Sequence, residues 1–212
     1  MTKIALILGG PSAKDLDVEK IDAQVIVGVN WAFLLGPRIT YNVCCDYRHM
    51  DRVLSDHVLV DGTVAAVRFS EWGMAGGKNF FVDHCQQHPN YAWTKTVKST
   101  YPEWPAFPKS VEDGLYCRNN VGLCGLNFAC LLIPRSGEIA IYGLDLDVNT
   151  STGKTENWHS EHNPRWKIDA TATYPEMLRE WEIAAKKVPA GIRVINMNSK
   201  SACKAFEFSG GK

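Results

Sequence analysis

The hydrophobic positions of this chain fall into short runs of strand length, and most of these runs are nearly continuous rather than alternating with polar residues. They cover residues 4–8, 25–29, 41–45, 64–69, 138–142 and 192–195. Continuous apolar runs of this length are typical of strands that are buried on both faces, as in a parallel sheet covered by helices. The pattern predicts an α/β, Rossmann-like fold with a mainly parallel sheet of about five to seven strands and helices on both faces.

Two helices are predicted among these runs. Residues 122–133 are mostly apolar and precede the run at 138–142. Residues 174–188 carry an apolar stripe at helical spacing, and Thr173 and Glu176 have the spacing of a capping box at its start. Helices that alternate with buried strands are the expected units of an α/β fold.

The periodicity disappears between residues 70 and 117, where glycine, proline and aromatic residues are frequent. A structureless stretch of this length is uncommon inside a compact domain unless it is functional or holds short elements of its own. We therefore expect an irregular, aromatic-rich insertion that acts as a lid. The whole chain, residues 1–212, is expected to form a single α/β domain, because 212 residues with 45% hydrophobic content can bury one sizeable core.

Charge and cysteine content narrow the function classes. Lys and Arg total 23 and Asp and Glu total 23, so the formal net charge is zero and nothing demands a polyanionic partner. The seven cysteines include no CxxC pair, which favours reduced thiols over a disulfide framework or a zinc knuckle. No signal peptide or transmembrane segment is expected, so the sequence predicts a cytoplasmic protein, with a homo-oligomer among the assemblies it allows.

The clearest candidate site follows the first apolar run, where Gly9, Gly10, Pro11 and Ser12 form a strand-to-loop turn. Glycine allows the backbone to come close to a ligand, and Ser12 can cap a following helix whose amide dipoles favour an anion. The turn therefore predicts a phosphate site. A tight turn after a core strand is the structural alternative for the same residues.

Polar residues also follow other predicted strands, and ligands of open α/β sheets bind beyond the carboxyl ends of the strands. Asn30 follows the second run, Asp145 and Asp147 the fifth, and Asn198 and Ser199 the last. A continued strand would place both carboxylates on one side, where they can hold a hard cation such as Mg²⁺ or contact ribose hydroxyls. One capping and one solvated aspartate is the equally supported alternative.

A polar loop before the second predicted helix carries His159 and His162. A neutral imidazole there can act as a general base at neutral pH, and two histidines at this spacing can also ligate a metal. A surface position without chemistry is the structural alternative for either histidine. The loop therefore predicts a candidate base without fixing which histidine supplies it.

Several of these motifs occur in an order that is known from one group of proteins. The turn at residues 9–12 is followed by Val29-Asn30, a helix start at Gly122, Gly143-Leu144-Asp145, the histidine loop and Asn198-Ser199. This order resembles the bacterial family 42 sialyltransferases and the related domain-of-unknown-function-115 proteins, which include an archaeal 6-hydroxymethylpterin pyrophosphokinase. The chain departs from the pattern at Asn120-Val121-Gly122, where the family has hydroxyl residues before the glycine.

The resemblance implies a Rossmann-like sheet that binds a nucleotide, in the transferase case CMP-sialic acid, without a tightly bound cofactor. It implies that the family's catalytic histidine falls on His162 or His159. The nucleotide contacts that it implies fall on Gly9, Gly10, Pro11, Ser12, Asn30, Asn120, Gly122, Asp145, Asn198 and Ser199.

Three functions are compatible with these features. The first is a glycosyltransferase-like enzyme that uses a nucleotide-activated sugar of the CMP-sugar type, with a histidine as general base. The second is a Mg²⁺-dependent pyrophosphokinase or nucleotidyl-type transferase in which Asp145 and Asp147 hold the metal. The third is a non-catalytic nucleotide-binding protein that closes its aromatic segment over the ligand. The sequence leaves the acceptor of the first function open.

Overall fold

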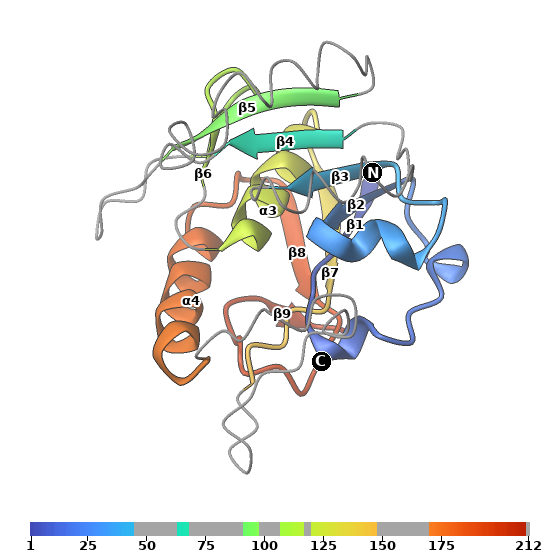
Figure 1. Cartoon of the computed structure of the whole chain (residues 1–212), viewed down its shortest axis with the longest axis vertical. Coiled ribbons are helices and arrows are strands. Elements are labelled where there is room, and N and C mark those ends of the chain that lie inside the picture. Colours follow the sequence, from blue (N-terminus) through green and yellow to red (C-terminus); the bar gives the residue numbers. More distant parts are fainter. Residues whose placement is uncertain (45–62, 68–90, 98–106, 117–119, 148–169, 211–212) are drawn as a thin grey trace, which may run out of the picture.

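Nine strands form one sheet in the computed structural model of the chain, which describes residues 1–44, 63–67, 91–97, 107–116, 120–147 and 170–210 (Figure 1). The strand order is β6-β5-β4-β3-β2-β1-β7-β8-β9, and every pairing is parallel. The strands are β1 (Thr2–Ile7), β2 (Val25–Val29), β3 (Tyr41–Cys44), β4 (Thr63–Val67), β5 (Tyr91–Val97), β6 (Leu115–Tyr116), β7 (Gly137–Tyr142), β8 (Ile192–Asn196) and β9 (Glu207–Phe208). The predicted α/β class with a mainly parallel sheet is confirmed. The sheet has more strands than the five to seven expected, because β5, β6 and β9 follow no continuous apolar run.

Strand β1 shows why the sequence pattern identified the sheet. It lies at the centre, with Ile4 opposite Val25 of β2 on one side and opposite Ile139 of β7 on the other. Its side chains alternate between two buried clusters, so Leu6 belongs to one cluster and Ile7 to the other. A strand that is covered on both faces needs apolar residues at every position, which produces the continuous run.

Helices α3 (Val121–Leu131) and α4 (Ala170–Ala185) cover one face of the sheet. Helix α3 packs closely, because a Cβ added at Gly125 would lie 2.6 Å from Cγ2 of Val29 and 2.9 Å from Cδ1 of Leu6. From α4, Trp181 and Ala184 enter the same buried cluster as Leu6. The absence of a side chain at Gly125 therefore lets α3 approach the two central strands.

Helix α4 begins earlier than the sequence indicated. The predicted capping box at Thr173 and Glu176 is wrong as a helix start, because the helix already begins at Ala170. The same spacing arises inside helices, since residues three positions apart share a face. The ends of both helices lie within a few residues of the predicted ones, as is usual for boundaries read from a sequence.

On the opposite face of the sheet from α3 and α4, the described residues form three short 3-10 segments. They are Pro11–Ala13 (η1), Val18–Lys20 (η2) and Asn30–Leu35 (η3). They contribute Ala13, Val18 and Phe33 to the second buried cluster, which also contains Ile7 of β1. The described part of the chain thus has elements on both sides of the sheet, with the longer helices on one side only. Figure 1 shows η3 in light blue in front of β1 and β2.

The segment predicted as an irregular insertion, residues 70–117, contains two strands of the sheet. Strand β5 lies within it and pairs with β4, and β6 pairs with β5. Phe107 and Leu115 are buried in the same cluster as the central strands. Residues 68–90 and 98–106 lie outside the described residues, so the role of this segment as a lid stays a prediction.

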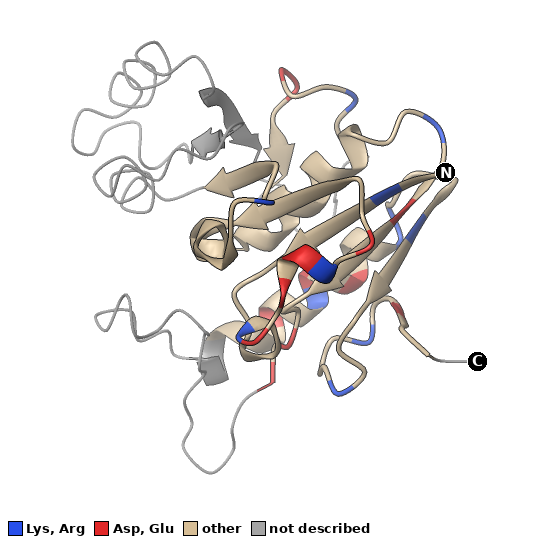
Figure 2. Ribbon diagram, turned by 90° about the vertical axis from the view of Figure 1, so that its right-hand side faces the viewer, with Lys and Arg blue, Asp and Glu red and all other residues tan. Residues whose placement is uncertain are grey.

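Buried thiols and mixed surface charge agree with the composition. Cys44, Cys124, Cys130 and Cys203 are buried thiols, and burial raises the pKa of the Cys130 thiol to about 12. Figure 2 shows Lys and Arg interspersed with Asp and Glu along the described ribbon. Within the described residues, none of the helices has the length and apolar character that crossing a membrane requires.

Candidate functional site

The strand order has a reversal point between β1 and β7. From β1 the sheet extends through β2 to β6 in one direction, and β7 then pairs with the opposite side of β1. The loops that follow β1 and β7 therefore leave the sheet next to each other. In open α/β folds this is the place where ligands bind, beyond the carboxyl ends of the strands.

Hydrogen bonds join these two loops to each other. The Leu8 amide donates to the Tyr142 carbonyl at 2.8 Å, and the Gly10 amide donates to the Gly143 carbonyl at 3.0 Å. The Ser12 amide donates to Oδ2 of Asp145 at 3.0 Å. The turn after β1 is thus held against the loop after β7 by its own backbone donors.

Asp145 connects a third loop to the same point. It is only 6% exposed, and its Oδ1 accepts a short hydrogen bond from Nδ2 of Asn198, in the loop after β8. Ser201 donates from Oγ to the carbonyls of Leu144 at 2.5 Å and Asp145 at 3.1 Å, and the Ala202 amide donates to the Asp145 carbonyl at 2.9 Å. We call the interaction of Asp145 with Ser12 and Asn198 the Asp145 clamp.

The clamp also involves the glycine turn that the sequence predicts as a phosphate site. Gly10 has a φ of −69°, which any residue adopts, but an added Cβ would lie 2.0 Å from Oδ2 of Asp145 and 2.4 Å from the Gly143 carbonyl oxygen. The space beside Gly10 is therefore filled by the protein itself. The Ser12 amide, which the sequence predicts to bind a phosphate, donates its hydrogen bond to the carboxylate of Asp145.

The expected helix after this turn also differs. Segment η1 is a single 3-10 turn of three residues, and its N-cap is Gly10 without a side-chain cap. Ser12 lies inside this turn and is exposed, so it does not cap a helix. A segment of this length lacks the aligned peptide dipoles on which an anion site of that kind depends.

The two aspartates after β7 do not form the expected alternating pair. Asp145 is buried and Asp147 is exposed. The strand ends at Tyr142, and Gly143 and Leu146 have positive φ angles of 73° and 47°, which interrupt the extended backbone. Both carboxylate oxygens of Asp145 already accept hydrogen bonds. The pair is therefore poorly arranged to share a Mg²⁺ ion.

Asn30, at the end of β2, has a different environment. It has a φ of 54°, an uncommon conformation for a residue with a side chain, and its carbonyl accepts a hydrogen bond from Nδ2 of Asn42 at 3.0 Å. Its Oδ1 atom is buried and has no hydrogen-bond partner in the described part of the chain. Buried acceptors without a hydrogen-bond donor are uncommon in folded proteins, so this atom can accept a hydrogen bond from a ligand.

Asn120 is the N-cap of α3 and has a complementary unpaired atom. Its Oδ1 accepts a hydrogen bond from the Gly122 amide at 3.1 Å, which is the usual capping interaction. The residue is 8% exposed, and among the described residues its Nδ2 has no acceptor. A Cβ added at Gly122 would lie 3.4 Å from Cδ1 of Leu8. The start of α3 therefore lies close to the end of β1.

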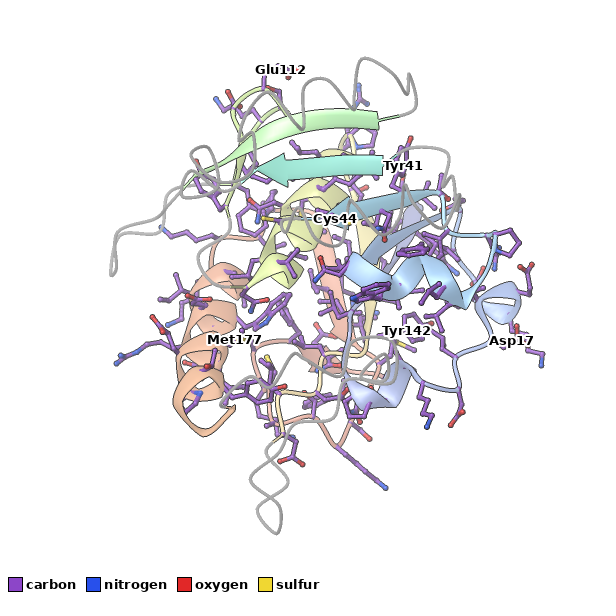
Figure 3. The ribbon with its side chains drawn as sticks, in the orientation of Figure 1. Asp17, Tyr41, Cys44, Glu112, Tyr142 and Met177 are labelled. Atoms are coloured by element: carbon purple, nitrogen blue, oxygen red, sulfur yellow. The ribbon has the colours of Figure 1, made fainter. Side chains whose placement is uncertain are left out.

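Asn30 and Asn120 thus flank the same region of the sheet. Asn30 follows Val29, against which Gly125 of α3 packs, and Asn120 begins that helix beside Leu8. Tyr142, labelled in Figure 3, ends β7 at the reversal point. Burial, with a smaller contribution from the Asp22 carboxylate, raises the pKa of the Tyr142 hydroxyl, so this residue is neutral at neutral pH.

The remaining predicted residues are divided between this region and undescribed parts of the chain. Gly9, Pro11 and Ser199 are in the loops after β1 and β8, and Pro11 and Ser199 are exposed. His159 and His162 lie outside the described residues. The sequence also indicated Asn196, at the end of the last predicted strand, and this residue is fully buried. It did not single out Asn42 or Ser201, which are fully buried as well. A polar residue inside an apolar strand was the available signal for Asn42.

Comparisons with known proteins give one likeness of fold. No family model matches the chain, and no curated protein sequence matches it. Its structure resembles that of the sialyltransferase CstII from Campylobacter jejuni, solved in complex with the substrate analogue CMP-3FNeuAc, with a TM-score of 0.51. The sequences are 14% identical, and the match covers 98% of this chain and 85% of the sialyltransferase. At this identity the likeness shows a shared fold.

Proposed function

We propose that this chain is a glycosyltransferase-like enzyme that binds a nucleotide-activated sugar at the carboxyl ends of β1 and β2, beside the start of α3. The observation that carries the proposal is the pair of buried, unpartnered amide atoms, Oδ1 of Asn30 and Nδ2 of Asn120. They flank the region where an open parallel sheet binds its ligand.

The chemistry of these two atoms suits a nucleotide. Oδ1 of Asn30 accepts and Nδ2 of Asn120 donates, so the pair recognises a ligand that presents both a donor and an acceptor. Leaving such an atom buried and unpaired costs about 1–3 kcal/mol, which a matching ligand recovers. Both atoms are buried, so a ligand that reaches them displaces the groups that cover them.

The start of α3 adds an electrostatic preference. The helix has 11 residues, and its peptide dipoles favour negative charge near the N-terminus. No acidic residue occupies its first turn. A nucleotide phosphate at this end would be stabilised by the dipole, and the stabilisation grows as the phosphate gains charge when it leaves the sugar.

The fold likeness supports the choice of substrate class. The sialyltransferase CstII was solved with a CMP-sugar analogue, and its structure matches nearly the whole of this chain. A CMP-sugar is therefore the first donor to test. The expected reaction joins an acceptor oxygen to the anomeric carbon of the sugar while the bond to the nucleotide phosphate breaks, and a general base takes the acceptor proton.

A histidine is the proposed base. His162, or alternatively His159, comes from the polar loop that the motif order assigns to this role. An imidazole with an ordinary pKa of about 6.5 is partly neutral at physiological pH and can accept a hydroxyl proton. The pyrophosphokinase alternative receives less support, because the arrangement of Asp145 and Asp147 does not favour a shared metal ion.

A binding panel with two variants of Asn120 tests the proposal. Thermal unfolding is measured with CMP, UMP, GMP, AMP and their sugar conjugates, with and without Mg²⁺, because a ligand of the folded state raises the melting temperature. We expect a cytidine nucleotide to stabilise the chain without Mg²⁺. Stabilisation only by a triphosphate with Mg²⁺ would favour the pyrophosphokinase instead.

The variants separate ligand contact from helix capping. Asn120→Ser keeps a cap for the Gly122 amide and removes the unpaired donor, whereas Asn120→Ala removes both. We expect Asn120→Ser to retain the stability of the parent chain and to lose about tenfold in nucleotide affinity, as for one lost hydrogen bond. Parent-like affinity in Asn120→Ser would contradict the proposed site.

A further inference from the structure

Asn42 is a fully buried asparagine in β3, with Tyr41 and Val43 on either side. Figure 3 labels the two ends of this strand, Tyr41 and Cys44. The Nδ2 atom of Asn42 donates to the Asn30 carbonyl at 3.0 Å and lies 3.1 Å from Sγ of Cys44. A buried amide in a central strand requires a reason, because burying it without full pairing is unfavourable.

The contact with Asn30 fixes the orientation of the Asn42 amide. A backbone carbonyl only accepts hydrogen bonds, so the nitrogen of the Asn42 side chain, and not its oxygen, must face it. The Oδ1 atom then points elsewhere, and it has no hydrogen-bond partner among the described residues. Asn42 therefore forms the hydrogen bond to Asn30 while its own Oδ1 atom stays without a partner among the described residues.

The same bond holds Asn30 in an uncommon backbone conformation. Residues with a side chain rarely adopt a φ of 54°, and such conformations persist where surrounding contacts fix them. The side chain of Asn42 donates a hydrogen bond to the Asn30 carbonyl, which belongs to the peptide group that follows this torsion angle. The direction of the Asn30 side chain depends on this torsion, so Asn42 fixes where Oδ1 of Asn30 lies.

Gly28 shows that the neighbouring strand makes room for Asn42. Gly28 of β2 is the register partner of Asn42, and an added Cβ would lie 2.9 Å from Oδ1 of Asn42 and 3.0 Å from Cβ of Ala32. A glycine inside an apolar strand weakens the strand. Here it leaves the space that the Asn42 side chain occupies.

We propose that Asn42 is a positioning residue for the nucleotide site, which acts by holding the Asn30 peptide so that the Asn30 side chain meets the ligand. The inference rests on the proposed function, because it requires Asn30 to contact a nucleotide. We assign Asn42 no ligand contact of its own, because its side chain lies within β3 and its nitrogen is used by Asn30 and Cys44. Its effect on binding must therefore pass through Asn30.

A double-mutant cycle with CMP as the probe tests whether Asn42 affects ligand binding through Asn30. Asn42→Leu keeps the branched shape and removes the donor, and Asn30→Gly accepts the positive φ and removes the side chain. We expect Asn42→Leu to weaken CMP binding about tenfold in the parent chain and to cause no further loss in the Asn30→Gly background, because coupled residues are not additive. Calorimetric titration gives the dissociation constants.

The control is Cys44→Ala, which removes the other partner of the Asn42 nitrogen and should leave CMP affinity within about twofold of the parent. Where Asn42→Leu does not fold, Asn42→Ser makes the same comparison, since its shorter side chain does not reach the Asn30 carbonyl. An equal loss in both backgrounds, or parent-like binding by the Asn42 variant, would overturn the positioning role. Unchanged CMP binding in Asn30→Gly would instead refute the proposed site.

Discussion

At the scale of single residues, the buried polar side chains divide into satisfied and unsatisfied ones. Asp145 uses both carboxylate oxygens within the protein, whereas Asn30 and Asn120 each keep one amide atom unpaired among the described residues. Buried groups without partners are uncommon and costly, so they indicate a ligand more strongly than paired groups do. Asp145 therefore supports the local architecture, and Asn30 and Asn120 remain the ligand contacts that we propose.

Replacement of Asp145 should destabilise the fold. Asp145→Ala leaves the Ser12 amide and the Asn198 side chain without their partner, and we expect the free energy of unfolding to fall by about 1–3 kcal/mol. Urea denaturation measures this change. The matched control is Asp147→Asn, because Asp147 is exposed, and it should stay within about 0.5 kcal/mol of the parent. Equal stability of Asp145→Ala and the control would show that the clamp contributes nothing.

Replacement of the proposed base should affect turnover alone. His162→Ala is expected to lower kcat by about 10²–10⁴ without changing nucleotide affinity, because a proton acceptor acts on the acceptor hydroxyl and not on the nucleotide. The measurement is steady-state transfer from the donor identified in the binding panel, with His159→Ala made in parallel. If both variants retain the parent rate, neither histidine is the base.

At the scale of elements, the apolar runs predicted β1, β2, β3, β4, β7 and β8 and missed β5, β6 and β9. Strand β5 contains three consecutive polar residues, Thr94, Lys95 and Thr96, and β6 and β9 have two residues each. Such short or mixed strands leave no continuous apolar run. The turn after β1 was recognised, but the length of η1 depends on hydrogen bonds that residues far along the chain supply.

Arg38, which lies between η3 and β3, binds the segment around η2 and gives a prediction at this scale. Its guanidinium donates from Nη1 to the carbonyls of Val18 at 2.8 Å and Ile21 at 2.6 Å, and from Nη2 to the Ala23 carbonyl at 3.0 Å. We expect Arg38→Met, which keeps an apolar stem, to lower the free energy of unfolding by about 1–3 kcal/mol.

Arg38→Lys distinguishes charge from geometry in the same urea experiment. A single ammonium group cannot reproduce the planar fork that reaches several carbonyls, so most of the loss should remain. Recovery of the full parent stability in Arg38→Lys would show that positive charge alone is sufficient. Arg135→Met, at an exposed position, is the matched control and should be nearly neutral.

The start of β1 carries an exposed ion pair with a defined pH dependence. The hydrogen bond and charge of Lys3 hold the pKa of Asp22 below its usual value of 3.8, and Asp22 raises the pKa of Lys3 above 10.5. The contribution of Asp22 is present above its unfolded pKa and is lost as the pH falls through the lowered pKa. The contribution of Lys3 is present below its unfolded pKa and is lost as the pH rises through the raised pKa.

The pair should therefore contribute a constant amount between about pH 5 and pH 9. We expect the stability difference between the parent and Asp22→Asn to be flat over this range and to vanish in strong acid. Added salt should reduce it, since the pair is exposed. Urea denaturation at several pH values measures it, and a difference that changes steadily through neutral pH would contradict the assignment.

At the scale of the whole molecule, the adjacency of β1, β2, β7 and β8 explains which parts of the site could be predicted. The sequence identified Asn30, Asp145 and Asn198 because polar residues follow apolar runs. It could not show that Asp145 turns back onto Ser12, since this contact joins residues 133 positions apart and requires the strand order. Nor could it show that Asn42 supports Asn30, because that contact crosses from β3 to the end of β2.

The central claim is that a nucleotide binds where the ends of β1 and β2 meet the start of α3. The most direct test is hydrogen–deuterium exchange of the chain with and without a saturating concentration of CMP. The account predicts slower exchange in residues 8–13, 29–31 and 120–123, with the second half of α4 unchanged. Failure of CMP to bind, or protection that omits the end of β2 and the start of α3, would contradict it.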